Sequence, residues 1–221
     1  MENNFLKNIK ILDKNKKESF ISQIFSNVSK NYDLMNDIMS LGLHRTWKEK
    51  FINLTDIRND SIVLDLASGS GDLTKIVKKK FRCDCIVFDS NLEMINQAKI
   101  KLQNFKIQYV NGNAEFLPFK KNFFDNVLVS FGLRNFTDIE KSLFEVQRIL
   151  KKNGKFFCME FSEVNNILLR KSFLFYSKII PKYGKFFSNN ELAYDYLVES
   201  IKQFPNQIQL TKKLKKAGFG K

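Results

Sequence analysis

Two glycines and one aspartate have the types and spacing of a nucleoside-binding site. Gly69 and Gly71 lie in the segment V-L-D-L-A-S-G-S-G-D, residues 63–72, where a short apolar run passes into an amphipathic segment. Glycine at such a turn permits a positive φ and lets a ligand approach the backbone closely. The N–H groups of a following helix favour an anionic group. Asp89 stands 20 residues after Gly69, at the end of the next apolar run, where a carboxylate can accept hydrogen bonds from both ribose hydroxyls.

The glycine turn leaves the kind of nucleoside open. A dinucleotide site typically has the pattern G-x-G-x-x-G, and here Thr74 occupies its sixth position, which weakens the case for a pyrophosphate. S-adenosylmethionine (SAM) needs only room for a methionine tail, whose carboxylate can use the same helix N-terminus. A plain tight turn without a ligand is the third alternative, and the spacing to Asp89 argues against it.

Polar residues also follow the next two apolar runs. Asn113 and Ala114 lie in N-G-N-A-E, residues 111–115, where the amide could hydrogen-bond an adenine edge; a simple polar loop is the alternative. Ser130 and Arg134 lie in V-S-F-G-L-R-N, residues 129–135. If these runs are parallel strands, their ends meet Asp89 at the carboxyl edge of one sheet, where open α/β sheets bind ligands.

The elements that position these residues alternate between short apolar runs and amphipathic segments. This alternation is typical of β-α-β units with a buried parallel sheet, and right-handed crossovers place helices on both faces. We therefore expect an α/β, Rossmann-like fold with an N-terminal helical segment. The predicted strands are residues 62–66, 85–88, 107–110, 124–129 and 156–160. Helical periodicity covers residues 19–35, 46–54, 72–80, 92–103, 139–150, 167–180, 191–204 and 208–217.

The composition fits one folded domain. The chain has 221 residues, of which 43% are hydrophobic, so it can bury a core without disulfides or metal. We expect residues 1–18 to form a flexible basic arm and residues 19–221 to form the domain. No stretch approaches the ~20 apolar residues of a membrane span, and the N-terminus lacks the apolar core of a secretory signal. Three cysteines and one histidine give no metal-ligand pattern.

The net charge of +14 has two competing explanations. Only six of the 37 basic residues are arginine, whereas nucleic-acid-binding surfaces favour arginine for its bidentate fork. We attribute most of the charge to an AT-rich coding bias and expect no nucleic-acid partner. Attraction to an anionic membrane surface stays open. The expected location is cytoplasmic, with peripheral contact at the inner face of the membrane as a variant.

Three segments together resemble one enzyme family. They are Y-D-L-M-N-D-I-M-S-L-G-L-H-R-T-W-K (residues 32–48), D-L-A-S-G-S-G-D (65–72) and F-G-L-R-N (131–135). They resemble the C-methyltransferases of ubiquinone and menaquinone biosynthesis, and the resemblance covers nearly the whole chain. It implies a class I methyltransferase sheet, SAM as methyl donor without a metal, and methylation of a ring carbon of a polyprenylated benzoquinol or demethylmenaquinol. The SAM contacts that it implies are Gly69, Ser70, Gly71, Asp89, Asn113, Ala114 and Ser130.

Methyl transfer to an aromatic carbon needs a deprotonated quinol held in line with the methyl group. Arg134 is our first candidate to stabilise the phenolate, because it is always charged and offers several donors. Asn135 could orient the quinol oxygen or a water, and Tyr32 could complete that relay. Glu160 and His44 are alternative bases. Glu160 could equally be a surface carboxylate, and His44 could simply hold the N-terminal segment together.

Other classes stay open. An RNA methyltransferase or another small-molecule methyltransferase would share the fold, but amino-methylating enzymes of nucleic acids usually carry N-P-P-Y or D-P-P-Y where this chain has S-F-G-L. The third class is a shortened, non-catalytic family member that binds SAM or quinol within a biosynthetic assembly. Whichever class holds, the protein could form a homo-oligomer or join a quinone-biosynthesis complex. The family's sheet has strands in the order 3-2-1-4-5-7-6, and no run after residue 160 reads as a strand. We therefore expect the last two strands to be missing and the fifth to be an exposed edge. Residues 168–180 could form a lid over the quinol.

Overall fold

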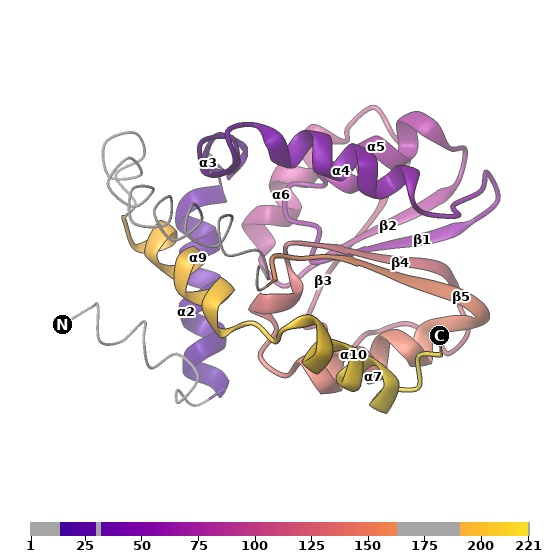
Figure 1. Cartoon of the computed structure of the whole chain (residues 1–221). Coiled ribbons are helices and arrows are strands. Elements are labelled where there is room, and N and C mark those ends of the chain that lie inside the picture. The colour runs from indigo at the N-terminus through magenta and orange to yellow at the C-terminus, as the bar shows by residue number, and fades with distance from the viewer. Residues whose placement is uncertain (1–13, 30–31, 163–190, 221) are drawn as a thin grey trace.

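A five-stranded parallel sheet forms the centre of the computed structural model, which describes residues 14–29, 32–162 and 191–220 (Figure 1). Its strand order is β3-β2-β1-β4-β5, and all four neighbouring pairs are parallel. The predicted α/β class and the order of these five strands are confirmed. The strands are β1 (Ile62–Leu66), β2 (Asp84–Asp89), β3 (Gln108–Asn111), β4 (Phe124–Ser130) and β5 (Leu150–Met159).

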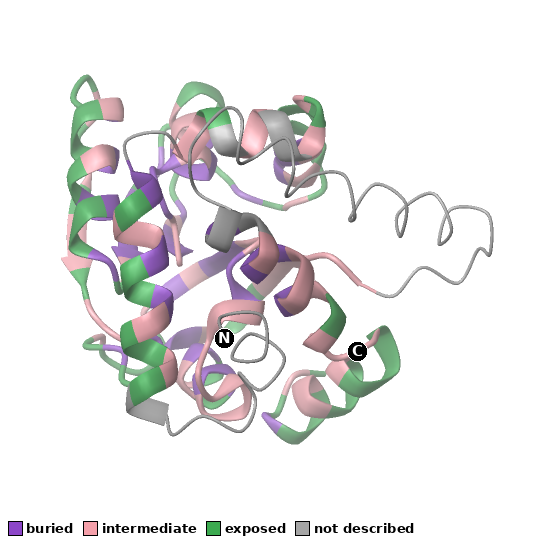
Figure 2. Ribbon diagram, turned by 90° about the vertical axis from the view of Figure 1, so that its left-hand side faces the viewer, coloured by how far each residue is buried: buried purple, intermediate pink, exposed green. Residues whose placement is uncertain are grey.

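Helices cover both faces of the sheet because its strands are apolar on both sides. Val63 of β1 packs in a cluster with Ile52 and Val77, whereas its neighbour Leu64 packs in another cluster with Val146. The helices α4 (Leu43–Asn53), α5 (Asp72–Lys80) and α6 (Leu92–Lys101) lie on one side, and α7 (Ile139–Ile149) and α10 (Gln207–Lys216) lie on the other (Figure 1). Buried residues therefore follow the sheet and the inward faces of these helices (Figure 2).

Three further helices gather near the carboxyl ends of the strands (Figure 1). They are α2 (Lys14–Val28), α3 (Tyr32–Ser40) and α9 (Glu191–Gln203), and a short 3-10 turn, η3 (Leu133–Asn135), meets α9. Ile24 of α2 and Tyr196 of α9 share one buried cluster with Met94 of α6. Since ligands of open α/β sheets bind at this edge, these helices form the walls of the candidate site.

The N-terminal boundaries differ from the sequence-based expectation. The helical periodicity of residues 19–35 is divided between α2 and α3, on either side of residues 30–31, which are not described. The helix α2 begins at Lys14, inside the segment 1–18 that we expected to be a flexible arm. Its Lys17 Nζ donates a hydrogen bond to the Phe136 carbonyl at 3.2 Å. Residues 14–18 are therefore helical, and Lys17 and Glu18 contact residues beside the carboxyl ends of the strands.

The last strand also begins earlier than expected. β5 starts at Leu150 rather than at residue 156, and its pairing with β4 shifts register between Phe124 and Asn126. This irregularity carries the polar residues 151–155 into the strand, although their composition indicates a loop. Residues 191–220 contain no strand, as expected, and β5 is the edge of the described sheet. The predicted helix and lid at residues 167–180 lie outside the described residues.

None of the described helices is long and apolar enough to cross a membrane.

Candidate functional site

The turn between β1 and α5 needs its glycines for conformation and for close packing. Gly69 has φ +55° and Gly71 has φ +82°, which confirms the expected positive φ. A Cβ on Gly69 would lie 3.3 Å from the Tyr32 ring, and one on Gly71 would lie 2.8 Å from Leu102. The two glycines therefore let α3 and α6 approach the turn.

The N-terminus of α5 already meets carboxylates of the chain itself. Thr74 donates from its backbone N–H and its hydroxyl to Asp65 Oδ2, at 3.0 and 2.7 Å. Burial raises the pKa of Asp65 to about 6, and the bonds from Thr74 oppose that shift. Asp72 lies in the first turn of α5 and is paired with Lys48 and Lys101, each at 2.7 Å. The Thr74 N–H, one of the helix N-terminal groups expected to meet an anionic ligand group, is thus already bonded to Asp65.

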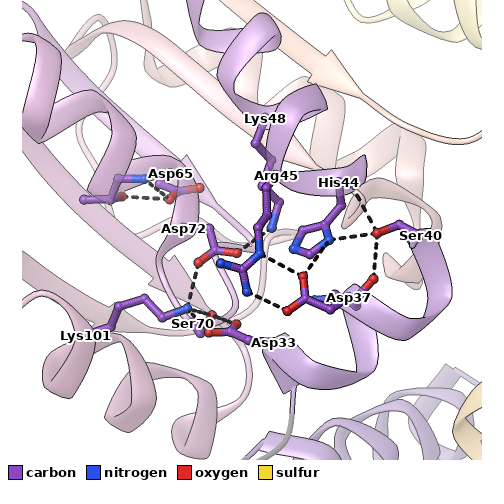
Figure 3. A network of polar contacts seen from close by, with 12 residues as sticks. Asp33, Asp37, Ser40, His44, Arg45, Lys48, Asp65, Ser70, Asp72 and Lys101 are labelled. Carbon is purple, nitrogen blue, oxygen red and sulfur yellow. Dashed lines mark hydrogen bonds and ion pairs between the residues drawn. The ribbon is translucent and has the colours of Figure 1, made fainter. Parts of the chain in front are cut away.

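A polar network joins the glycine turn to the N-terminal helices (Figure 3). Ser70 Oγ donates to Asp33 Oδ1 at 2.9 Å and accepts from Lys101 Nζ at 2.6 Å. Although burial of Asp72 acts in the opposite direction, Lys48 and Lys101 hold the pKa of this carboxyl well below its usual range. The Ser70 hydroxyl is thus committed within the protein. The prediction that Ser70 contacts SAM therefore concerns only its backbone atoms.

A cavity of about 400 Å³ lies at the carboxyl ends of the strands, and we name it the nucleoside cavity. Its volume is in the range typical of small-molecule sites. Four residues predicted from the sequence line it: Asp89 from β2, Asn113 and Ala114 after β3, and Asn135 from η3. The structure therefore brings together residues that are far apart along the chain.

Asp89 is held ready to accept further hydrogen bonds. Its Oδ2 accepts from the Gly69 N–H at 2.8 Å, and its Oδ1 accepts from the Asn91 N–H at 2.9 Å. Each carboxylate oxygen keeps a further lone pair for a ligand hydroxyl. Burial raises the pKa of Asp89, and the backbone N–H groups oppose this shift.

The side chains of Asn113 and Asn135 also form hydrogen bonds within the protein. Asn113 Oδ1 accepts from the Glu115 N–H at 2.8 Å, and its Nδ2 donates to Glu18 at 3.0 Å. Asn135 Oδ1 accepts from the Tyr196 hydroxyl at 2.9 Å. The adenine contact of Asn113 and the catalytic role of Asn135 stay predictions. Nothing in the sequence pointed to Tyr196, because it lies on a distant helix.

The ends of β1 and β4 carry unusual backbone and two unpartnered hydroxyls. Ala67 and Phe131, both non-glycine, have φ +55° and +56°, a conformation that costs of order 1–3 kcal/mol and clusters at functional sites. The Ser68 and Ser130 hydroxyl oxygens are buried without a hydrogen-bond partner among the described residues. Such an orphan costs about 1–3 kcal/mol, so both oxygens indicate a polar ligand at this point.

A second, smaller cavity of about 50 Å³ adjoins the nucleoside cavity, because Ala67 lines both. We name it the acceptor cavity. Tyr32, His44, Ser130 and Arg134 line it. Burial raises the pKa of Tyr32 to about 12, and the hydrogen bond with Asn36 opposes that shift. The phenol is therefore protonated at neutral pH and serves as a hydrogen-bond donor.

Arg134 forms a buried ion pair with Glu160. Nη1 lies 2.7 Å from Glu160 Oε1, and the two side chains are only 7% and 3% exposed. The guanidinium also donates to the Phe131 carbonyl and to Ser200 at 3.3 Å, and it lies over the Phe161 ring. The alternative that Glu160 is a surface carboxylate is wrong. Arg134 joins η3, β5 and α9 in addition to any role towards a ligand.

In the part of the chain that the structure describes, no three His, Cys, Asp or Glu side chains come close enough to hold a metal ion.

Comparison with solved structures shows the fold. A SAM-dependent methyltransferase from Thermotoga maritima matches with a TM-score of 0.64 at 19% identity, over 91% of this chain and 82% of that one. A SAM-dependent methyltransferase from Aquifex aeolicus matches with a TM-score of 0.57 at 15% identity, over 77% and 78% of the two chains.

Comparison of sequences shows the family. The "Ubiquinone/menaquinone biosynthesis C-methyltransferase UbiE" of Rickettsia bellii is 46% identical over 217 residues, which are 93% of this chain and 86% of that protein. The protein of the same name from Wigglesworthia glossinidia brevipalpis is 45% identical, over 93% and 85% of the two chains. The model of the ubiE/COQ5 methyltransferase family matches residues 13–221. The chain belongs to the ubiE/COQ5 methyltransferase family.

Proposed function

We propose that this protein transfers a methyl group from SAM to a ring carbon of a polyprenylated quinol, a step of ubiquinone or menaquinone biosynthesis. The observation that carries the proposal is the 45–46% identity, over 93% of the chain, to relatives with that printed name. The two adjoining cavities support it, since methyl transfer needs donor and acceptor side by side.

The residues of the nucleoside cavity fit SAM. Asp89 would accept from the ribose hydroxyls, and Asn113 and Ala114 would border the adenine. The unpartnered Ser68 and Ser130 hydroxyls line the acceptor cavity, so the methionine end would reach them past Ala67, where the two cavities adjoin. When bound, SAM supplies a methyl group activated by a positively charged sulfur. A dinucleotide fits less well, because the N-terminus of α5 that would take its pyrophosphate already holds Asp65 and Asp72.

The acceptor cavity fits the developing charge of a quinol oxygen. Arg134 lines the cavity while paired with Glu160, and its guanidinium has further N–H groups that can donate a hydrogen bond to the phenolate oxygen. Tyr32 can donate a hydrogen bond to the same oxygen, because its raised pKa of about 12 keeps the hydroxyl protonated. Asn135 lines the nucleoside cavity instead, so we assign it the orientation of a water at the junction.

The substrate's polyprenyl tail requires the enzyme to meet a membrane surface. We infer a cytoplasmic protein that touches the bilayer peripherally, where the net charge of +14 favours anionic lipids.

The test uses purified protein, SAM with a deuterated methyl group, and two reduced acceptors with short prenyl tails: a methoxy-benzoquinol and a demethylmenaquinol. Mass spectrometry should find the label on a ring carbon of one or both, and no transfer to the oxidised quinones. The Asp89→Ala variant is the control for cofactor binding. SAM binding without transfer to either quinol, combined with methylation of bulk RNA, would favour the nucleic-acid alternative. SAM binding without any transfer would favour a non-catalytic family member.

A further inference from the structure

His44 lies in the wall of the acceptor cavity, and the mechanism proposed above does not use it. It belongs to the first turn of α4 and is 4% exposed. Tyr32, Ser130 and Arg134 line the same cavity. In a buried histidine, each of the two ring nitrogens needs its own hydrogen-bond partner.

The hydrogen bonds around Ser40 determine the tautomer of His44 (Figure 3). Ser40 has one hydroxyl hydrogen, and it donates to the Asn36 carbonyl at 2.7 Å. The contact between Ser40 Oγ and His44 Nδ1, at 2.8 Å, must then be a donation from the ring. Asp37 Oδ1 lies 3.7 Å from the same nitrogen and favours a hydrogen there. A neutral ring protonated on Nδ1 carries its lone pair on Nε2.

The surroundings keep this ring neutral. Burial lowers the pKa of His44 and Lys48 lowers it further, while Asp37 and Asp72 raise it and Arg45 lowers it slightly. The other titratable or charged groups that line the acceptor cavity are Tyr32, Asp65 and Arg134. An imidazole with a pKa below its usual range is unprotonated at neutral pH, as a general base must be.

We propose that His44 Nε2 is the general base of the reaction, a role that rests on the function proposed above. It takes the proton of the quinol hydroxyl, directly or through one water held in the acceptor cavity. The electron pair of the resulting phenolate forms the bond between ring carbon and methyl, and the methyl–sulfur bond breaks with its pair going to sulfur. The hydrogen on the methylated carbon then leaves to solvent as a proton. His44 returns its proton to the oxygen, so one proton is released per turnover. Asp37 and Ser40 are positioning residues that keep the hydrogen on Nδ1.

The decisive variant is His44→Asn. Its amide nitrogen stands near the place of Nδ1 and can still donate to Ser40, but it offers no basic nitrogen in the cavity. Calorimetry should find SAM affinity within about twofold of wild type, whereas kcat should fall by about 10²–10⁴-fold, the usual contribution of a positioned base. In wild type, kcat/KM should fall on the acid side, below the ordinary histidine pKa of ~6.5, and this fall should vanish in the variant.

Two further variants separate a base from a merely structural histidine. Added imidazole should restore part of the activity of His44→Gly, because it can enter the space left by the ring. Asp65→Asn should keep the acid fall of kcat/KM, which shows that the buried carboxyl beside the cavity is not its source.

Turnover of His44→Asn within threefold of wild type, or an acid fall that persists in it, would overturn the role of His44 and leave the proposed function standing. If His44→Asn does not fold, the absence of imidazole rescue in a folded His44→Gly overturns the role. A wild-type protein that binds SAM and methylates no quinol overturns both proposals together, because the base then has no hydroxyl to deprotonate.

Discussion

Removing Glu160 should destabilise the protein strongly, because it leaves the Arg134 guanidinium buried without its counter-charge. The two side chains are 7% and 3% exposed, so the pair belongs to the buried class, in which loss of one partner costs about 3–5 kcal/mol. The Phe131 carbonyl still accepts from the guanidinium, which favours the lower end of that range. For a chain of this length, about 2–4 °C of melting temperature corresponds to each kcal/mol. We therefore expect Glu160→Leu to melt about 6–20 °C lower.

A double-mutant cycle measures this coupling. Urea unfolding of Glu160→Leu, Arg134→Met and the double variant gives the free energies of unfolding, and the double variant should recover most of the loss, because two apolar side chains of similar size replace the pair. Recovery should be incomplete by about 1–2 kcal/mol, since Glu160 also accepts from the backbone N–H groups of Arg134 and Phe161. A loss below about 1 kcal/mol for either single variant, as at exposed ion pairs, would refute the reasoning.

Three further outcomes follow from the site. Asp89→Ala should weaken SAM binding by about 1.5–3 kcal/mol, and calorimetry that finds unchanged affinity would contradict the ribose contact. The folded-state pKa of Asp65, about 6, lies above its ordinary value, so its stabilising contribution is complete below about pH 4 and is lost as the pH rises through 6. Wild type should therefore lose about 2 kcal/mol of unfolding free energy relative to Asp65→Asn between pH 4 and pH 7, and parallel urea-unfolding profiles would argue against this. Lys101→Ala should lower the free energy of unfolding by about 1–3 kcal/mol and speed amide exchange in α3, because Lys101 forms ion pairs with Asp33 and Asp72. The matched control is Lys99→Ala, at an exposed position of the same helix, whose free energy of unfolding should stay within about 0.5 kcal/mol of wild type.

The strands of the sheet could be predicted from the sequence because the patterns that mark them are local, whereas their order was expected from the family resemblance. Continuous apolar runs mark strands buried on both faces, and each β-α-β unit returns the chain to the same edge. For that reason Asp89, Asn113 and Ser130 were expected at one edge, where the structure has them. β5 was placed less well, because its first half is polar and joins the sheet only through a shift of register.

The charge pairs of the site could not be predicted in the same way. Arg134 and Glu160 stand 26 residues apart, and Ser70, Asp33 and Lys101 come from three elements. Each pairing depends on how α3 packs on α6, or η3 on β5, and no periodicity of the sequence encodes that packing. Ser70 was accordingly expected among the SAM contacts, whereas in the structure its hydroxyl bonds to Asp33 and Lys101.

The N-terminal helices connect the glycine turn, where we propose that SAM binds, with the acceptor cavity. Residues 32–48 are one of the three segments that carry the family resemblance. Among their described side chains, Tyr32 and His44 line the acceptor cavity, and none lines the nucleoside cavity. The same segment is fastened to the glycine turn, because the Tyr32 ring packs on Gly69 and Asp33 bonds to Ser70. We therefore expect a ligand bound at the turn to hold this wall of the acceptor cavity in place as well. Under the proposed function, α3 and α4 would then contribute to the selection of the acceptor, and the turn to the binding of the methyl donor.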